Sequence, residues 1–279
     1  MGMHHSGALD LSSFDGALVP DDESSIAMID LTRVTFIDAY GLVGLACYIA
    51  AAAGEGYSVQ LRLPVSEELR TYLARMHLGE VIDRYDVESD GTLPEVRELD
   101  RRDSLIELQS FRDVHGSDRL AAFIWDRLVG RADSEVVTQL YEATGELGLK
   151  VVEHAGSPAG GFVAAQRYQR GQPGERAIVA VGDVGVGLRE SLRGLHGPMT
   201  DGEAIDRAIQ RDVSRFSDPG RGQGLASVVE GVRALGGTVR IRTGGASRDI
   251  SRWATEGNDV LLPLQGTIVG ARLPCRPGR

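Results

Sequence analysis

Two stretches of the sequence combine residue types and spacing that could do chemistry on a bound ligand. Residues 145–156, GELGLKVVEHAG, place Glu146 and Lys150 four positions apart, which puts both on one face of a helix. Residues 179–188, VAVGDVGVGL, read as an apolar strand that delivers Asp183 into a glycine-rich turn. A carboxylate on such a turn can accept a hydrogen bond from an exocyclic amine, which is one way to select adenine.

A third stretch, residues 219–232, reads PGRGQGLASVVEGV and is a glycine-rich loop that leads directly into a helix. Amide groups at the start of a helix attract anions, and Gly220, Gly222 and Gly224 leave room for phosphate oxygens. The loop is not a P-loop, because no Lys-Ser/Thr pair follows it, and the glycines after Asp183 lack the dinucleotide GxGxxG spacing.

The surrounding patterns predict the elements that must position these residues. We expect an α+β sandwich, with helices first and then an antiparallel sheet with helices inserted. Its expected elements are a strand at 104–111, helices at 119–128 and 134–154, strands at 162–168 and 177–181, glycine loops at 182–187 and 220–224 with a mixed helical stretch between them, a helix ending at 235, and strands at 238–243 and 266–273.

A separate α/β module precedes this one. Residues 26–31 and 57–63 read as strands, the alanine-rich stretch 39–53 as a helix, and 66–76 as a second helix, which gives the order βαβα. The charge-dense segment 86–103 reads as a linker, so we predict domains at 1–85 and 104–279.

Composition narrows the class of protein. The 279 residues carry 40 acidic against 30 basic side chains, and 18 of the acids but only 6 of the bases lie in residues 1–100. The resulting net charge of −10 disfavours nucleic acid or an anionic membrane as a partner. The two cysteines have no metal-ligand spacing, and the start of the chain has no signal-peptide pattern, so we expect a reduced, cytoplasmic protein.

The first module resembles the STAS domain of anti-sigma-factor antagonists over about residues 25–82, on the motif IDLTRVTFIDAYGLVGL at 29–45. It resembles an abbreviated form, because only about 25 residues precede the central strand. The family's switch serine is replaced here by the loop Asp38-Ala39-Tyr40-Gly41. The resemblance implies a docking module that serine phosphorylation cannot switch, with Asp38 and Tyr40 on the partner-binding surface. From the residues alone, Asp38 is an ordinary helix cap, and Tyr40 is either an interface anchor or a half-buried packing residue.

The three chemical stretches, in this order and followed by GTIVGARLP at 266–274, resemble the GHKL ATP-binding family of histidine kinases, anti-sigma-factor serine kinases, gyrase and Hsp90. The resemblance covers about 170 residues and implies ATP or ADP as the ligand. Asp183 would read adenine, and Gly185 and Gly187 would shape the pocket. Residues 188–219 would form a lid over the phosphates. The phosphate loop would consist of Gly220, Arg221, Gly222, Gln223, Gly224 and Leu225.

Glu146 corresponds to the family's acidic residue that activates the attacking group, whereas Lys150 stands where the family has the asparagine that holds magnesium. The resemblance therefore leaves a role for Mg²⁺ in doubt, because an ammonium group cannot ligate a metal. Lys150 is the only lysine of the chain. Three readings stay open at this point: Lys150 neutralises the phosphates in place of the metal, or it closes the pocket by pairing with Glu146, or ordinary catalysis persists.

The resemblances together imply a cytoplasmic signalling regulator that binds nucleotide with weak or no turnover and docks regulatory proteins through its first module. The alternatives are an active serine protein kinase that phosphorylates a separate STAS protein, and a scaffold without nucleotide. The sequence leaves open whether the chain forms a homodimer.

Overall fold

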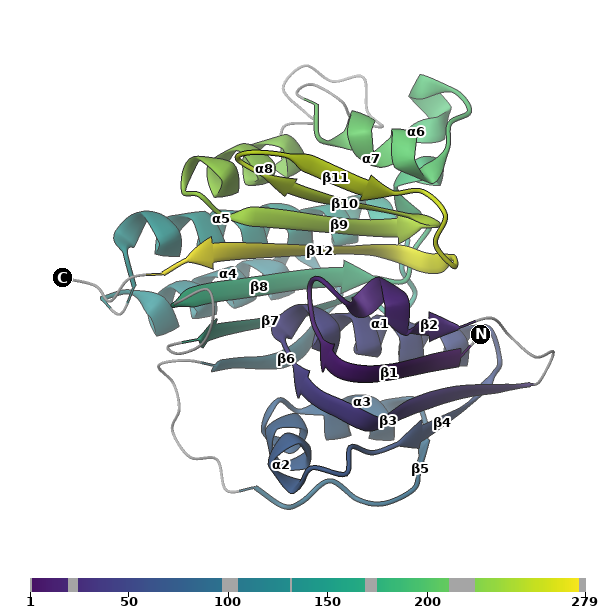
Figure 1. Ribbon diagram of the computed structural model, residues 1–279. Coiled ribbons are helices and arrows are strands. Elements are labelled where there is room, and N and C mark those ends of the chain that lie inside the picture. Colours follow the sequence, from purple (N-terminus) through teal and green to yellow (C-terminus); the bar gives the residue numbers. More distant parts are fainter. Residues whose placement is uncertain are drawn as a thin grey trace.

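The computed structural model describes residues 2–19, 25–96, 105–130, 132–168, 175–210 and 224–275. Its strands form two sheets, one mixed and one antiparallel, with helices between and around them (Figure 1). No helix in the described part of the chain is both long and apolar enough to cross a membrane.

The first sheet has five strands in the order β2-β1-β3-β4-β5, and all neighbouring pairs are parallel except β1 with β2. Its elements are β1 (Gly2–Leu9), a 3-10 turn η1 (Phe14–Ala17), β2 (Leu18–Val19), β3 (Ile26–Ile37), helix α1 (Ala39–Gly54), β4 (Ser58–Arg62), α2 (Glu67–Arg75), α3 (Leu78–Arg84) and β5 (Glu88–Ser89).

The second sheet has seven strands in the order β11-β10-β9-β12-β8-β7-β6, and every pair is antiparallel. Its elements are β6 (Leu105–Phe111), α4 (Val114–Leu128), α5 (Ser134–Lys150), the π-turn η2 (Val151–Ala155), β7 (Gly161–Tyr168), β8 (Arg176–Asp183), α6 (Gly187–His196), α7 (Asp201–Ala208), α8 (Gly224–Ala234), β9 (Thr238–Gly244), β10 (Ala246–Ser251), β11 (Thr255–Asn258) and β12 (Leu264–Pro274).

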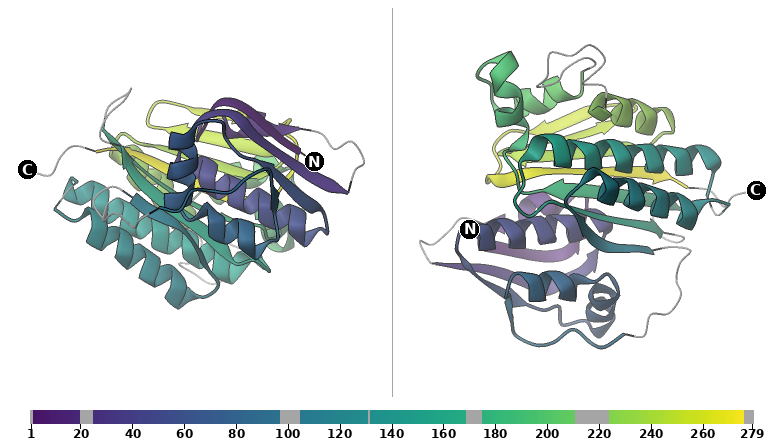
Figure 2. Two further views of the ribbon diagram at one scale, coloured as in Figure 1. Left: turned by 90° about the horizontal axis from the view of Figure 1, so that it is seen from below. Right: turned by 180° about the vertical axis from the view of Figure 1, so that it is seen from behind.

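Both faces of the seven-stranded sheet are covered. Helices α5 and α8 pack on one face, while α1 of the first module packs on β7, β8 and β12 from the other (Figures 1 and 2). Along β8 the residues alternate between two cores: Ile178 and Ala180 join the core around α1, whereas Val179 and Val181 join the core around α5. The core around α1 therefore contains residues of both modules.

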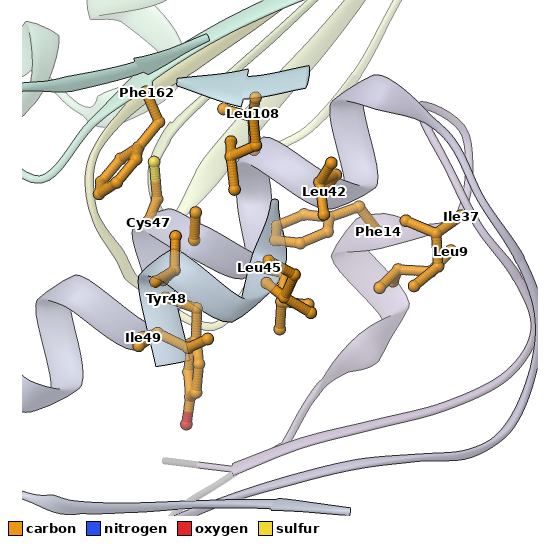
Figure 3. Close-up of a cluster of buried hydrophobic side chains, with 14 of the residues drawn as sticks. Leu9, Phe14, Ile37, Leu42, Leu45, Cys47, Tyr48, Ile49, Leu108 and Phe162 are labelled. Carbon is orange, nitrogen blue, oxygen red and sulfur yellow. The ribbon is translucent and has the colours of Figure 1, made fainter. Parts of the chain in front are cut away.

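Helix α1 is apolar on all sides, which is typical of a helix buried between two layers. It begins at its cap Asp38, whose carboxylate accepts a hydrogen bond of 2.8 Å from the backbone N–H of Gly41. In Figure 3 the side chain of Cys47 points toward Phe162 of β7, whereas Tyr48 points the opposite way. Each face of the helix thus serves a different sheet.

Buried ion pairs join the modules near the start of α1. Asp15 of η1 lies 2.6 Å from the guanidinium of Arg240 and 3.0 Å from Nε of Arg242, both on β9. Arg240 also pairs with Asp249 of β10. Since Arg240 and Arg242 are both buried, Asp15 supplies the negative charge that these cations need in the interior.

The structure differs from the sequence-based expectations in several elements. Strands β1 and β2 precede the central strand β3 of the first module, and part of the expected linker forms β5. The first glycine loop begins later than predicted, since Gly182 and Asp183 are the last residues of β8. Strands β10 and β11, which the sequence reading missed, complete the second sheet.

Candidate functional site

The candidate site begins at the carboxyl-terminal end of α5, where Glu146 and Lys150 follow one another on a helix face as predicted. Both side chains meet the first residue of α8. A Cβ atom placed on Gly224 would collide with the Glu146 carboxylate and would lie 3.0 Å from Cε of Lys150. The fold therefore brings the first and third chemical stretches into direct contact, and a larger residue at position 224 would require the Glu146 and Lys150 side chains to move.

The amino-terminal end of α8 is the natural place for an anion, because the backbone N–H groups of a first helical turn lack partners within the helix. In the structure the Glu146 carboxylate lies at this end, and Lys150 is beside it. Leu225 is buried in the core. Gly220, Arg221, Gly222 and Gln223, which the sequence assigns to the phosphate loop, lie outside the described residues.

Asp183 ends β8 as a buried carboxylate, 5% exposed. It accepts a hydrogen bond of 2.7 Å from the backbone N–H of Gly185 and another from the backbone N–H of Thr267 on β12. Burial raises the pKa of Asp183 to about 7, and these two hydrogen bonds oppose that rise. An acceptor held in this way can discriminate among the hydrogen-bonding groups of a base.

The turn after Asp183 is tied to the end of the α5–η2 helix. The backbone N–H of Val186 donates to the carbonyl of Ala155 at 2.8 Å, and a Cβ on Gly185 would collide with the same carbonyl. Since η2 directly follows Lys150, the turn after Asp183 contacts the first chemical stretch one helical turn beyond Lys150. The glycine at 185 is needed for this close approach.

Gly187 starts α6 with a φ of +74°, a conformation that L side chains rarely adopt. Thr243 of β9 completes the start of this helix: its Oγ1 accepts from the backbone N–H of Leu188 at 3.2 Å and donates to the carbonyl of Gly266 at 2.9 Å. The sequence reading assigned no role to Thr243, because nothing local marks a strand threonine as the cap of a helix 55 positions earlier.

The described part of the predicted lid consists of α6 and α7, and α7 is fastened to the edge of the sheet. Asp201 accepts from the backbone N–H of Gly245 at 2.7 Å. Arg248 of β10 binds Asp206 of α7 through two hydrogen bonds of 2.8 and 2.9 Å. Residues 211–219 of the predicted lid lie outside the described residues.

The structure corrects the placement of Asp38 and Tyr40 on a partner-binding surface. Asp38 is 2% exposed and also accepts a hydrogen bond of 3.1 Å from the backbone N–H of Leu11, which agrees with the helix-cap reading. Burial raises its pKa to about 6. Tyr40 is completely buried and lies against Gly270 of β12 and the ring of Phe14. The second module of the same chain covers the surface that a partner was expected to use.

Four arginines lie on strands β9 and β10 or directly after them: Arg240, Arg242, Arg248 and Arg252. The first three are buried in ion pairs, and Arg242 is not exposed at all. Arg252 differs, since it lies over the ring of the exposed Trp253. Among their acidic partners, Asp15 and Asp206 come from distant segments of the chain.

One cavity of about 460 Å³ lies elsewhere, between the end of β6 and the first turns of α4. None of its lining residues belongs to the candidate site. Within the ranges that the structure describes, no group of three or more histidine, cysteine or acidic side chains is arranged to hold a metal ion. The nucleotide site that the sequence predicts therefore rests, among the described residues, on α5, β8 and α8.

Compared with known proteins, the chain matches no protein-family model and no curated protein sequence.

Proposed function

We propose that the second module binds an adenine nucleotide, ATP or ADP, and that the chain is a regulatory protein whose conformation responds to that ligand. One observation carries the proposal: the start of α8 meets Glu146 and Lys150 of α5 at Gly224. The helix start, the glycine without a side chain and the Lys150 cation favour phosphate oxygens, whereas the Glu146 carboxylate at the same place must move aside to admit them.

The base would be read by Asp183. Its carboxylate is fixed by the backbone N–H groups of Gly185 and Thr267, and the turn that follows is bonded to η2. A fixed carboxyl oxygen accepts a hydrogen bond from the exocyclic amine of adenine, whereas guanine presents a carbonyl oxygen at the corresponding position. We therefore expect ATP to bind more tightly than GTP.

The phosphates would be neutralised by Lys150 rather than by a metal ion. An ammonium group donates hydrogen bonds and repels Mg²⁺, so it can replace part of the positive charge of the metal but not its coordination of the transferred phosphoryl group. Phosphoryl transfer depends strongly on that metal. Slow turnover or none follows, and the protein would act by holding nucleotide rather than by consuming it.

The test is a titration of a fluorescent ATP analogue into the parent, Asp183→Asn and Asp126→Asn. Asp126 lies on the exposed side of α4 and provides a control that makes the same chemical change away from the site. We expect the parent and the control to bind alike and Asp183→Asn to lose at least about tenfold in affinity, which corresponds to about 1.4 kcal/mol. If the parent does not bind the analogue, the proposal is wrong.

A further inference from the structure

Helix α1 of the first module reaches the back of the strand that carries Asp183. A Cβ placed on Gly182 would lie 2.7 Å from Sγ of Cys47 and 2.8 Å from Cγ1 of Val43. Both distances are shorter than ordinary van der Waals contacts, so the packing of α1 on β8 requires a glycine at position 182. Figure 3 shows Cys47 among the buried side chains that fill the space between α1 and the second sheet.

Gly182 and Asp183 are neighbours at the end of β8, and side chains alternate across a strand. Gly182 faces α1, so Asp183 faces the layer of α5 and η2. The same short segment is therefore held on one face by the first module and presents the nucleotide-reading carboxylate on the other. Because protein interiors are close-packed, a displacement of Val43 or Cys47 must move this segment.

Two further contacts fix the position of α1 on the sheet. Tyr40, one turn before Val43, lies 2.5 Å from where a Cβ of Gly270 would stand on β12. Near it, Asp15 lies 2.6 Å from the Arg240 guanidinium and 3.0 Å from Nε of Arg242, on β9. The helix is thus anchored to β9 and β12 at its start and to β8 one to two turns later.

We propose that Val43 and Cys47 are positioning residues for Asp183, so that docking of α1 and binding of nucleotide reinforce each other. This inference rests on the proposed function, because Asp183 must read the nucleotide for its position to matter. The coupling is reciprocal: whatever docking of α1 contributes to nucleotide affinity, nucleotide contributes to the docking of α1. The first module would then be a fixed part of the nucleotide site.

The first test adds a methyl group at the contact of Gly182 with Val43 and Cys47 and then removes the side-chain atoms that crowd it. Gly182→Ala should weaken binding of the fluorescent ATP analogue by at least about tenfold, and Val43→Ala with Cys47→Ala in the same chain should restore most of the loss. Gly79→Ala is the matched control, because a Cβ at this helical glycine of the first module meets no atom within 4 Å. Undiminished affinity in Gly182→Ala, or a loss that the two relieving substitutions leave unchanged, would overturn the inference.

The second test uses the parent protein and decides the matter even if Gly182→Ala does not fold. Both cysteines are buried, Cys47 in the core around α1 and Cys275 in the core around α5. Thiol labelling in dilute urea, quantified at each cysteine by mass spectrometry, reports how often each region opens. Saturating ATP analogue should slow labelling of Cys47 several-fold more than labelling of Cys275.

Equal protection of the two cysteines, or none, would overturn the inference while leaving the proposed function intact, provided that the analogue binds. If the analogue does not bind the parent at all, the proposed function fails and the inference fails with it. The two failures are therefore distinguishable in one set of measurements.

Discussion

Asp15 in η1 and Arg242 in β9 form an ion pair of 3.0 Å across the boundary between the two modules, and the Arg242 side chain is completely buried. The backbone carbonyls of Thr243, Gly244 and Ala246 accept further hydrogen bonds from the same guanidinium. The pair thus joins the first module to the interior of the second sheet, and removal of either partner leaves an unbalanced charge there.

Substitution of Asp15 by Asn should therefore destabilise the whole chain rather than one module. Breaking a buried pair by removal of one partner costs about 3 to 5 kcal/mol, because the remaining charge is buried without compensation. We expect a loss near 3 kcal/mol in a urea unfolding experiment, since Arg240 keeps Asp249 as a partner. Glu190→Gln removes an exposed partner of Arg193 and should change stability little. A loss for Asp15→Asn as small as that control's would contradict this account.

Two substitutions of Tyr40 distinguish a packing role of this residue from a partner-binding role. Its ring is completely buried, and within the described residues its hydroxyl has no hydrogen-bond partner. Tyr40→Phe removes only this unsatisfied hydroxyl, so we expect unchanged or slightly increased stability. Tyr40→Ala should cost about 3 to 5 kcal/mol through the cavity that it leaves. Thermal unfolding of the two variants measures the contrast, and a severe loss in Tyr40→Phe would show that the hydroxyl has a partner.

The buried carboxyl of Asp183 predicts a pH dependence of stability. Burial raises its pKa from 3.8 to about 7, so the folded chain holds this proton more tightly than the unfolded chain does. The resulting stabilisation is complete below about pH 4 and is lost as pH rises through about 7. Relative to Asp183→Asn, which cannot ionise, the parent should lose roughly 2 to 4 kcal/mol over this range. Parallel urea stability curves for the two proteins between pH 4 and 7 would contradict the burial of this group.

The elements with a clear local pattern were predictable from the sequence. Helix α1 follows from an alanine-rich stretch with a capping aspartate, and α2 follows from its cap Ser66, whose side chain accepts from the backbone N–H of Leu69. Strands β7, β8 and β12 were expected from their apolar runs. Each of these predictions depends on residues close together in the chain, where propensity and capping decide the outcome.

Local sequence patterns did not predict which element covers the second face of the seven-stranded sheet. They did indicate that both faces of its central strands are buried. Residues 162–165 and 177–181 are continuous apolar runs, which are typical of strands buried on both faces. The run alone does not say which element supplies the cover. That element, α1, comes from more than 100 positions earlier in the chain.

Strand β10 shows the opposite difficulty. Its sequence ASRDIS has little apolar pattern, because Arg248 is neutralised by Asp206 and Asp259 from other elements and Asp249 by Arg240. A charged residue reads as exposed until its partner is known. The candidate site was predictable as a set of motifs, whereas the contact of Gly224 with Glu146 and Lys150 required the fold.

The central proposal is that Lys150 neutralises the phosphates without a metal ion, and calorimetric titration of ATP into the parent and into Lys150→Asn, each with Mg²⁺ and with EDTA, tests it most directly. The account predicts that the parent binds equally under both conditions and that Lys150→Asn binds substantially more tightly with Mg²⁺ than with EDTA. Binding by the parent that is lost in EDTA, or no binding by the parent under either condition, would contradict it.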